Sequence, residues 1–348
     1  MIHKNFHTSK PFFVAEISAN HNGLLQNAKK LIYIAKKYGA DAVKLQTYTP
    51  DTMTINSHRD EFKIKSGLWK GKTLWKLYEE AQTPFEWQKQ LFEYAKKLKI
   101  TCFSSPFDDS AVDLLEKIGC PFYKVASFEM TDLPLIKKIA RTRKPMIIST
   151  GMADLKEIDL AFNAAKKNGC KDIALLYCVS NYPSKPSDFN FHNIKILKER
   201  YNCKIGFSDH STDNKIVAAA IASGADIIEK HIALAGQKKG PDIAFSLKGK
   251  QISDYSKVIQ DTHLLMGKKF FYRNKSESSS LKFRRSIYVI KDINKGEKFT
   301  KKNIKVIRPG YGVEPKYFEK LLKKKSLFNI KGQTPIKRSL LKKLKISI

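Results

Sequence analysis

Lysine, hydroxyl, carboxylate and histidine side chains recur at the ends of short apolar segments along most of the chain. Lys44 and Gln46 are two residues apart in one such segment, and Glu229 and His231 are two residues apart in another. Side chains alternate along a strand, so the members of each pair share a face. A lysine inside a folded protein is costly unless an anion or a carboxylate pairs with it. We therefore expect a cationic, hydrogen-bonding cup that binds a small, highly charged anion.

Two histidines follow neighbouring predicted strands and are candidates for one metal site. His210 and His231 could converge on a single ion, with Glu229 or Asp209 adding an oxygen ligand. Two imidazoles, oxygen ligands and open positions suit a divalent cation that acts as a Lewis acid. Spacing alone leaves open that both are hydrogen-bonded structural or acid–base residues. His21, in the first predicted loop, stays unassigned, and the other histidines are predicted to lie at the surface: His3, His7, His58, His192 and His263.

The lysine of another predicted strand has a second possible chemistry. Lys124 could form a Schiff base with a carbonyl substrate, as the lysine of a class I aldolase does. The residues alone do not exclude this alternative.

The elements that must position these residues are short β-rich runs alternating with amphipathic segments. This alternation predicts parallel strands with helical crossovers, and eight units favour a closed (β/α)8 TIM barrel over an open sheet. Catalytic residues of such barrels lie at the C-terminal ends of the strands. No Gly-rich dinucleotide fingerprint follows a predicted strand. The predicted strands are Phe12–Ser18, Ala42–Thr47, Thr101–Ser105, Phe122–Ser127, Met146–Thr150, Ile173–Ser180, Lys204–Ser208 and Asp226–His231.

The connection after the second predicted strand is unusually long. Residues Tyr48–Thr83 exceed a common strand–helix loop, and long loops at that end of a barrel often cover the active site. The amphipathic segments include Leu25–Tyr38, Pro84–Leu98, Ser110–Ile118, Leu155–Asn168 and Asp213–Ser223.

The pattern changes near Gly267, which predicts three parts: a barrel over residues 1–267, a linker over 268–281 and a small module over 282–348. Lys268–Leu281 is rich in Lys, Ser and Asn, as linkers are. After it, Ser286–Ile290 is a predicted strand, and Asn294–Gly296 is a turn signal. A module this small needs a further surface to bury its apolar face.

The net charge of +32 is the extreme feature of the composition. Only nine of the 65 basic residues are arginine, and the lysines are spread along the chain without a nucleic-acid-binding motif. We therefore expect no nucleic-acid partner, although such a charge attracts anionic substrates. A non-catalytic basic binding protein is the alternative, but it gives no reason for Lys, Ser, Glu and His at successive strand ends.

No segment reaches the roughly 20 consecutive apolar residues of a membrane helix, and residues 1–10 lack a signal-peptide core. These features predict a cytoplasmic protein without a membrane partner. Five cysteines without a CxxC pair predict reduced thiols in the core.

Taken together, the strand-end motifs resemble those of the N-acetylneuraminic acid (sialic acid) synthase family, whose members condense phosphoenolpyruvate with an amino-sugar aldehyde. The matching segments, in order, are E-I-S-A-N-H-N-G, V-K-L-Q-T, F-S-S-P-F, Y-K-V-A-S-F-E, I-I-S-T-G-M, F-S-D-H, I-I-E-K-H and G-P-D. The tail resembles the antifreeze-like SAF domain of that family through R-S-I-Y-V, D-I-N-K-G-E and R-P-G-Y-G. The resemblance covers nearly the whole chain.

Within the family, the chain is most similar to the pseudaminic acid synthases, through the segments Gly71–Tyr78 and Thr83–Trp87 and the strand end C-V-S-N-Y-P. N-acetylneuraminate synthases usually carry asparagine where Ser180 stands, which makes N-acetylmannosamine a less suitable substrate. The resemblance implies condensation with 2,4-diacetamido-2,4,6-trideoxy-altrose and release of phosphate by C–O cleavage. Legionaminic and N-acetylneuraminic acid synthesis are the alternatives.

The resemblance also implies the roles of individual residues. His210 and His231 would bind Mn2+, Co2+ or Mg2+, which would polarise the aldehyde oxygen, and no organic cofactor is expected. Glu16 would stabilise developing positive charge or position water, and Arg308 would reach a sugar N-acetyl group from a partner subunit in a domain-swapped homodimer. Phosphoenolpyruvate would be held by Lys44, Lys124, Ser105, Ser127, Ser149 and Ser208. The sugar would be contacted by Gln46, Glu129, Tyr182 and Asp242.

Two enzymatic alternatives remain beside this interpretation. A barrel synthase that makes an unaminated keto-deoxy sugar acid phosphate shares the mechanism, but the C-terminal module argues against it. A Schiff-base aldolase would use Lys124 as a nucleophile instead of a cation.

Overall fold

A computed structural model describes residues 10–268 and 270–347 of the 348-residue chain. The chain divides into two compact units, residues 1–267 and 268–348, and each is described by itself. Within the described residues, none of the helices combines the length and the apolar character that crossing a bilayer requires. All five cysteines are free thiols, as the sequence predicts.

The first unit is a closed parallel barrel, which confirms the predicted architecture. Each strand pairs with the next along the chain, and β1 also pairs with β8 to close the barrel. A two-residue strand, β9 (Leu247–Lys248), pairs in parallel with the end of β8. The barrel strands are β1 (Phe12–Glu16), β2 (Ala42–Thr47), β3 (Thr101–Pro106), β4 (Tyr123–Val125), β5 (Met146–Ser149), β6 (Ile173–Cys178), β7 (Lys204–Asp209) and β8 (Ile227–Ala233).

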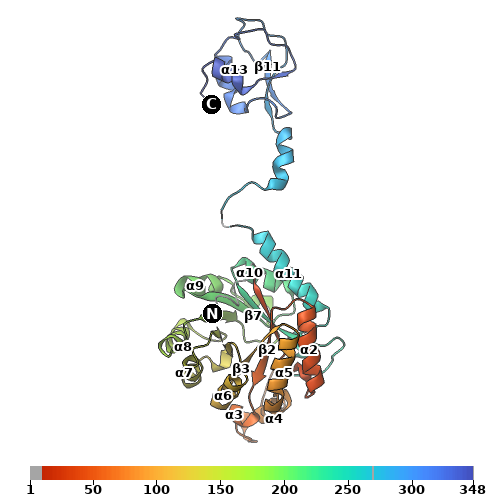
Figure 1. Ribbon diagram of the computed structural model, residues 1–348, viewed down its shortest axis with the longest axis vertical. Helices are drawn as coiled ribbons and strands as arrows, with labels where there is room; N and C mark the ends of the chain where they lie inside the picture. The colour runs from red at the N-terminus through yellow and green to blue at the C-terminus, as the bar shows by residue number, and fades with distance from the viewer. Residues whose placement is uncertain (1–9, 269, 348) are drawn as a thin grey trace. The chain divides into compact units, whose positions relative to one another are not determined.

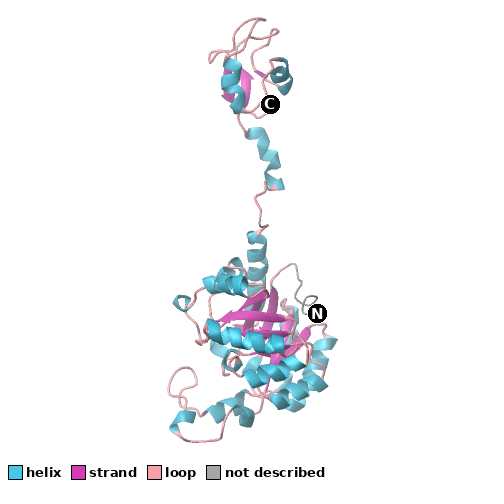
Figure 2. Ribbon diagram, turned by 90° about the vertical axis from the view of Figure 1, so that its left-hand side faces the viewer, coloured by secondary structure: helices cyan, strands magenta, loops and turns pink. Residues whose placement is uncertain are grey.

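Amphipathic helices surround these strands, as Figures 1 and 2 show. Their apolar faces pack on the outward side chains of the barrel and form one core with them. Four of them begin after an aspartate whose carboxylate accepts backbone N–H groups, namely Asp108, Asp132, Asp154 and Asp213. The helices are α2 (Leu25–Lys37), α5 (Phe85–Lys97), α6 (Asp109–Lys117), α7 (Leu133–Arg141), α8 (Leu155–Lys167), α9 (His192–Arg200), α10 (Asn214–Ala222) and α11 (Gln251–Met266).

A buried polar group joins the barrel to α11. Asp209 accepts a hydrogen bond of 2.7 Å from the Tyr255 hydroxyl and lies 3.3 Å from Lys230 Nζ. Asp209 and Lys230 alternate with the inward residues of β7 and β8, so they point away from the barrel interior. Asp209 therefore stabilises the packing of α11 and is not available as the oxygen ligand considered from the sequence.

The long connection after β2 folds into helices of its own. It contains α3 (Pro50–Met53), η2 (Asp60–Phe62) and α4 (Leu74–Ala81), and Lys63 bridges to Thr73. In Figure 1, α3 and α4 lie together at the lower edge of the first unit. Other strand ends continue into short 3-10 turns, which are η1 (Ser18–His21), η3 (Ser127–Glu129), η4 (Pro186–Asp188) and η5 (Ile243–Phe245).

The second unit is a small three-stranded antiparallel sheet with short helices. Its strand order is β11-β10-β12, and its own buried cluster includes Ile287, Phe299 and Leu341. The segment predicted as a linker is partly helical, because η6 begins at Lys275 and is capped by Asn274. The elements are η6 (Lys275–Phe283), β10 (Ser286–Val289), β11 (Ile304–Ile307), η7 (Pro315–Tyr317), α12 (Phe318–Leu322), β12 (Thr334–Pro335) and α13 (Arg338–Lys343).

Candidate active site

A cavity of about 490 Å³ opens where the barrel strands end. Inward-facing residues of the strands form its floor, and the strand–helix loops form its sides. Most of the predicted site residues line it, namely Lys44, Gln46, Lys124, Ser127, Glu129, Ser149, Tyr182, Ser208, His210, His231 and Asp242.

Lys44, Lys124 and Glu229 line the floor of this cavity, and Glu16 lies buried behind Lys44 and completes a cluster of two lysines and two glutamates. Lys44 Nζ lies 2.7 Å from Glu16 Oε2 and 3.0 Å from Glu229 Oε2. Lys124 Nζ lies 3.9 Å from Glu229 Oε1 and donates a hydrogen bond of 2.6 Å to Ser149 Oγ. All four charged side chains are buried, so each depends on the others for neutralisation. The cup is therefore charge-balanced, whereas the sequence predicted a cationic one.

The pairing sets the protonation of these groups. Burial lowers the pKa of Lys44, and the charge of Lys124 lowers it further, but Glu229 opposes both, which leaves the pKa at about 8. Burial would raise the pKa of Glu229, yet Lys124 and Lys44 bring it below its ordinary value. Ser208 supports that charge with a hydrogen bond of 2.9 Å to Glu229 Oε1. Glu229 is thus an ionised partner of the lysines, and its carboxylate is not free to be a metal ligand.

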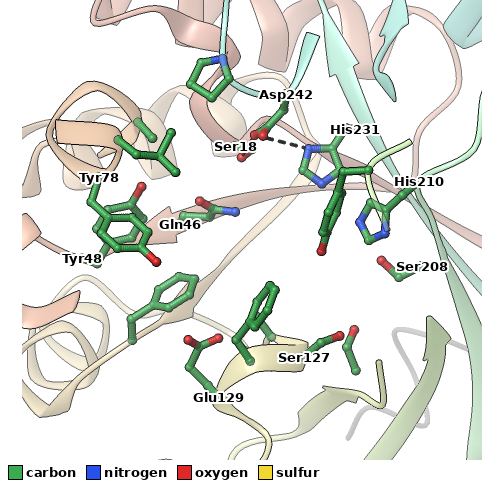
Figure 3. A pocket seen from close by; sticks show the side chains of 18 of the residues that line it. Ser18, Gln46, Tyr48, Tyr78, Ser127, Glu129, Ser208, His210, His231 and Asp242 are labelled. Carbon is green, nitrogen blue, oxygen red and sulfur yellow. Dashed lines mark hydrogen bonds and ion pairs between the residues drawn. The ribbon is translucent and has the colours of Figure 1, made fainter. Parts of the chain in front are cut away.

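His210 and His231 lie together on one side of the cavity (Figure 3), with ring centroids 5.4 Å apart. His210 Nδ1 lies 3.2 Å from the Val179 carbonyl oxygen and 3.7 Å from Cys178 Sγ. Burial would lower the pKa of His210, but the adjacent Cys178 raises it. Burial lowers the pKa of His231 well below its ordinary value, and the charge of His210 adds to this. His231 is therefore the neutral imidazole that metal ligation requires.

The donor set around these histidines fits a divalent ion. His231 Nδ1 is buried, forms no hydrogen bond within the described chain, and lies 3.7 Å from Asp242 Oδ2. A hydrogen bond from His210 Nδ1 to the Val179 carbonyl leaves the other ring nitrogen free as a ligand. Among the residues that the structure describes, no group of three or more His, Cys, Asp or Glu side chains is placed to hold one ion. The chain thus offers two imidazoles and leaves the other positions to oxygen atoms of substrate or water.

The residues predicted to contact sugar are spread around the rest of the cavity. Asp242 accepts a hydrogen bond from Ser18 Oγ, and the Tyr182 ring packs between His210 and Phe245. Burial raises the pKa of Glu129 to about 7. Its Oε2 has no hydrogen-bond partner in the described part of the chain, so it is free to bind a ligand.

Three predicted site residues do not line the cavity. Glu16 is fully buried behind Lys44, and its Oε1 accepts a hydrogen bond of 2.6 Å from the Ser18 backbone N–H. Ser105, at the end of β3, is buried beside Gln46 in the strand register. Arg308 is exposed in the second unit. Because Glu16 does not reach the cavity, its charged contact is with Lys44, which it holds in place.

His21, which the sequence left unassigned, has a structural environment. Its Nε2 lies 3.1 Å from Thr83 Oγ1, and burial lowers its pKa to about 4. It therefore ties the first loop to the end of the long connection as a neutral ring. His58 and His192 are exposed as predicted and His263 is half-buried, while His3 and His7 lie outside the described residues.

Sequence reasoning missed several lining residues. Glu229 was predicted to share a face with His231 and to be a possible oxygen ligand, but its pairing with Lys44 and Lys124 was not predicted. The aromatic and aliphatic lining residues come mostly from the long connection after β2, where Leu74, Leu77 and Tyr78 have the i, i+3, i+4 spacing of one face of α4 and the others have no periodic signal. These residues are Tyr48, Met53, Ile64, Trp69, Leu74, Leu77, Tyr78, Phe107 and Phe128.

Known proteins are similar in sequence to this chain over nearly its whole length. The pseudaminic acid synthase of Helicobacter pylori is 44% identical over 327 residues, which cover 94% of this chain and 96% of that protein. The N,N'-diacetyllegionaminic acid synthase of Campylobacter jejuni is 36% identical over 326 residues, which cover 92% of this chain and 97% of that protein.

A solved structure of the same kind is the N-acetylneuraminic acid (sialic acid) synthetase from Leptospira borgpetersenii in complex with citrate. It superposes with a TM-score of 0.70 at 29% identity and covers 78% of this chain and 90% of that chain. The NeuB family matches residues 31–270, and the SAF domain matches residues 284–342. The chain belongs to the NeuB family.

Proposed function

We propose that this protein condenses phosphoenolpyruvate with 2,4-diacetamido-2,4,6-trideoxy-altrose to form pseudaminic acid and inorganic phosphate. The observation that carries this proposal is the pair of buried lysines, Lys44 and Lys124, in the same cavity as two adjacent histidines. The two lysines can bind an anionic enol phosphate. The two histidines are on the side of the cavity where a carbonyl would be activated. The higher identity to a pseudaminic acid synthase, 44% against 36% for a legionaminic acid synthase, favours this sugar.

Phosphoenolpyruvate has a phosphate and a carboxylate, and the cavity floor offers groups for both. Lys44 and Lys124 supply ammonium groups, and the hydroxyls of Ser127, Ser149 and Ser208 face the same space. Ser105 belongs to this proposed set through its buried hydroxyl, which has no hydrogen-bond partner in the described chain. Because the lysines are already paired with Glu229 and Glu16, they are held in place before the substrate arrives.

His210 and His231 would hold the divalent ion, Mn2+, Co2+ or Mg2+, without an organic cofactor. When bound, the ion supplies Lewis-acid polarisation of the aldehyde oxygen of the open-chain sugar. Within the protein, the Val179 carbonyl and Cys178 orient the His210 ring.

The reaction forms a bond between the methylene carbon (C3) of phosphoenolpyruvate and the aldehyde carbon. Positive charge then develops on the carbon that bears the phosphate oxygen, and water adds there. Cleavage of the C–O bond releases phosphate. Glu229 would offset the developing charge, and Glu16 would contribute by positioning Lys44.

The sugar would be contacted by Gln46, Glu129, Tyr182 and Asp242, and by Arg308 of a partner subunit in a domain-swapped homodimer. Support for Arg308 comes from the matched SAF domain and the Arg308-Pro309-Gly310 motif. We propose that the protein works in the cytoplasm and that neither a nucleic acid nor a membrane is a partner.

A substrate panel tests the proposal. Purified protein with Mn2+ and phosphoenolpyruvate is given the 2,4-diacetamido-2,4,6-trideoxyhexoses of altro and manno configuration, N-acetylmannosamine, or a phosphorylated aldose. We expect the highest kcat/KM with the altro sugar, measured by phosphate release and product mass. A higher value with another sugar would reassign the substrate, and no condensation with any amino sugar would reject the proposal.

A further inference from the structure

The cavity has two chemically different sides. Figure 3 shows His210 and His231 on one side and Tyr48 and Tyr78 on the opposite side, with Gln46 between them and Glu129 below Gln46. If the aldehyde lies beside the histidines, the groups carried farther along the sugar face the tyrosines. The tyrosine side would therefore select sugars by the substituents at those carbons.

This tyrosine side is built largely by the long connection after β2. An edge-to-face series of rings, Tyr78 on Tyr48 at 5.9 Å and Tyr48 on Phe107 at 5.1 Å, gives it a fixed shape. The aliphatic side chains of Leu74 and Leu77 lie beside these rings in the cavity lining. Such a surface suits a methyl group better than a free hydroxyl.

Three polar groups on this apolar side have no protein partner. In the described part of the chain, no hydrogen bond is formed by the hydroxyl of Tyr48, which is 3% exposed, or by that of Tyr78, which is half-buried. Glu129 Oε2 is likewise buried without a hydrogen bond. Burial raises the pKa of both tyrosines, so both hydroxyls keep their protons and can donate. Buried polar groups are normally satisfied, so Glu129 Oε2 is expected to bind a ligand, and the two tyrosine hydroxyls are available to donate to the same ligand.

We infer that Tyr48, Tyr78 and Glu129 form a subsite for the acetamido group at C4 of the sugar. The acetamido carbonyl accepts hydrogen bonds from the tyrosine hydroxyls, and its N–H donates to Glu129. Its methyl group packs on Leu74 and Leu77. This inference rests on the proposed function and adds the residues that select a diacetamido sugar over a sugar with a hydroxyl at C4.

The test compares two sugars that differ only at C4. These are 2,4-diacetamido-2,4,6-trideoxy-altrose and its analogue with a C4 hydroxyl, 2-acetamido-2,6-dideoxy-altrose. In Tyr78→Phe and Tyr48→Phe, the ratio of their kcat/KM values should fall by about tenfold, the effect of losing one buried hydrogen bond. The KM for phosphoenolpyruvate should stay unchanged, which a general disturbance of the barrel would not allow. Tyr33→Phe, on the exposed face of α2, is the matched control and should keep the ratio.

Each outcome separates this inference from the function on which it rests. If wild-type protein condenses neither sugar with phosphoenolpyruvate, the proposed function is wrong and the subsite with it. If wild-type protein prefers the diacetamido sugar and both tyrosine variants keep that ratio, the subsite is wrong and the function stands. If neither tyrosine variant folds by circular dichroism, Glu129→Gln gives the same comparison, and an unchanged ratio there contradicts the subsite.

Discussion

At the scale of single residues, the lysines of the cavity floor serve as fixed cations. Lys124 lies 3.9 Å from Glu229 and donates to Ser149, so its positive charge is stabilised on two sides. A Schiff base needs the amine of Lys124 as a nucleophile directed at a carbonyl carbon, whereas this amine is engaged by a carboxylate and a hydroxyl. The geometry therefore favours anion binding over the aldolase alternative that the sequence left open.

We predict that borohydride added during turnover attaches neither a pyruvyl nor a sugar mass to Lys124. In water labelled with 18O, the label should enter the C2 oxygen of the product and not the released phosphate, because the C–O bond breaks. Mass spectrometry of the protein, product and phosphate checks both statements. Label in the phosphate would mean P–O cleavage and would overturn the proposed mechanism.

The two histidines give a second prediction at this scale. Chelation should abolish turnover, and Mn2+, Co2+ or Mg2+ should restore it, because His210 and His231 are the proposed protein ligands. His210→Ala and His231→Ala should lose most activity and bound metal while circular dichroism stays unchanged. His192→Ala, at an exposed site, is the control. Full activity in thoroughly demetallated protein would contradict the metal-dependent mechanism.

Glu129 makes stability depend on pH. Burial raises its pKa from 4.5 to about 7, opposed by Lys124 and Lys44 and supported by Asp132, while Tyr78 faces it from α4. The unfolded state therefore loses the proton first as pH rises, and the cost of the buried charge appears between about pH 4.5 and 7. Glu129→Gln, neutral throughout, should match wild type near pH 4 and be more stable by about 3 kcal/mol above pH 7.5.

Urea unfolding of both proteins across this pH range measures the difference. Glu93→Gln, at an exposed position of α5, is the control and should show no such trend. A Glu129→Gln advantage that is constant or falls with pH would contradict the raised pKa.

At the scale of elements, alternating patterns predicted the barrel well because burial on both sides of a strand leaves a continuous apolar run. The predicted Ala42–Thr47 coincides with β2. The predicted Phe122–Ser127 is longer than β4, because the backbone turns into η3 at Ser127. That turn places Ser127 and Glu129 in the cavity lining, a feature without a period-two signal.

The sequence predicted the polar strand ends of the site but not its apolar side. The Tyr48–Thr83 connection was expected to cover the active site, yet which of its residues face the cavity depends on how α3 and α4 pack. Leu74, Leu77 and Tyr78 have the spacing of one face of α4, but the residues of this connection outside the helices have no fixed period, so sequence spacing carries no information on their direction. For Glu229, the strand period correctly predicted the direction of the side chain. Its two lysine partners come from other strands, so the pairing could not be predicted from the spacing within β8.

The buried group between the barrel and α11 gives a prediction at this scale. Tyr255→Phe removes the 2.7 Å hydrogen bond to Asp209 without changing the ring. We expect a loss of about 1–3 kcal/mol in the free energy of unfolding, since Asp209 stays buried with one fewer partner. Urea unfolding measures this, and Tyr33→Phe at the exposed face of α2 should change stability by less than about 0.5 kcal/mol. Equal stability of wild type and Tyr255→Phe would show that the hydroxyl contributes nothing.

At the scale of the whole molecule, the second unit buries apolar side chains of its own. Its buried cluster comprises 14 residues and stands apart from the barrel core. Part of the segment that precedes β10 is helical from Lys275 onward. Residues 268–281 therefore span at most about 37 Å, less than the roughly 45 Å of a fully extended chain.

The last prediction concerns the proposed exchange of Arg308 between subunits. Its guanidinium is exposed in the second unit, and such a group binds carbonyl oxygens well. Two reciprocal exchanges close a twofold dimer, so each site would combine a barrel from one subunit with Arg308 from the partner. Lys124→Ala and Arg308→Ala should each be inactive alone. When the two are mixed, unfolded and reassembled, one site of each heterodimer has both residues intact, and part of the activity should return. Size-exclusion chromatography with differently tagged chains verifies the heterodimers. No recovery in confirmed heterodimers of two inactive parents would rule out the shared site, because an Arg308 that serves its own barrel leaves every site of the mixture with one lesion.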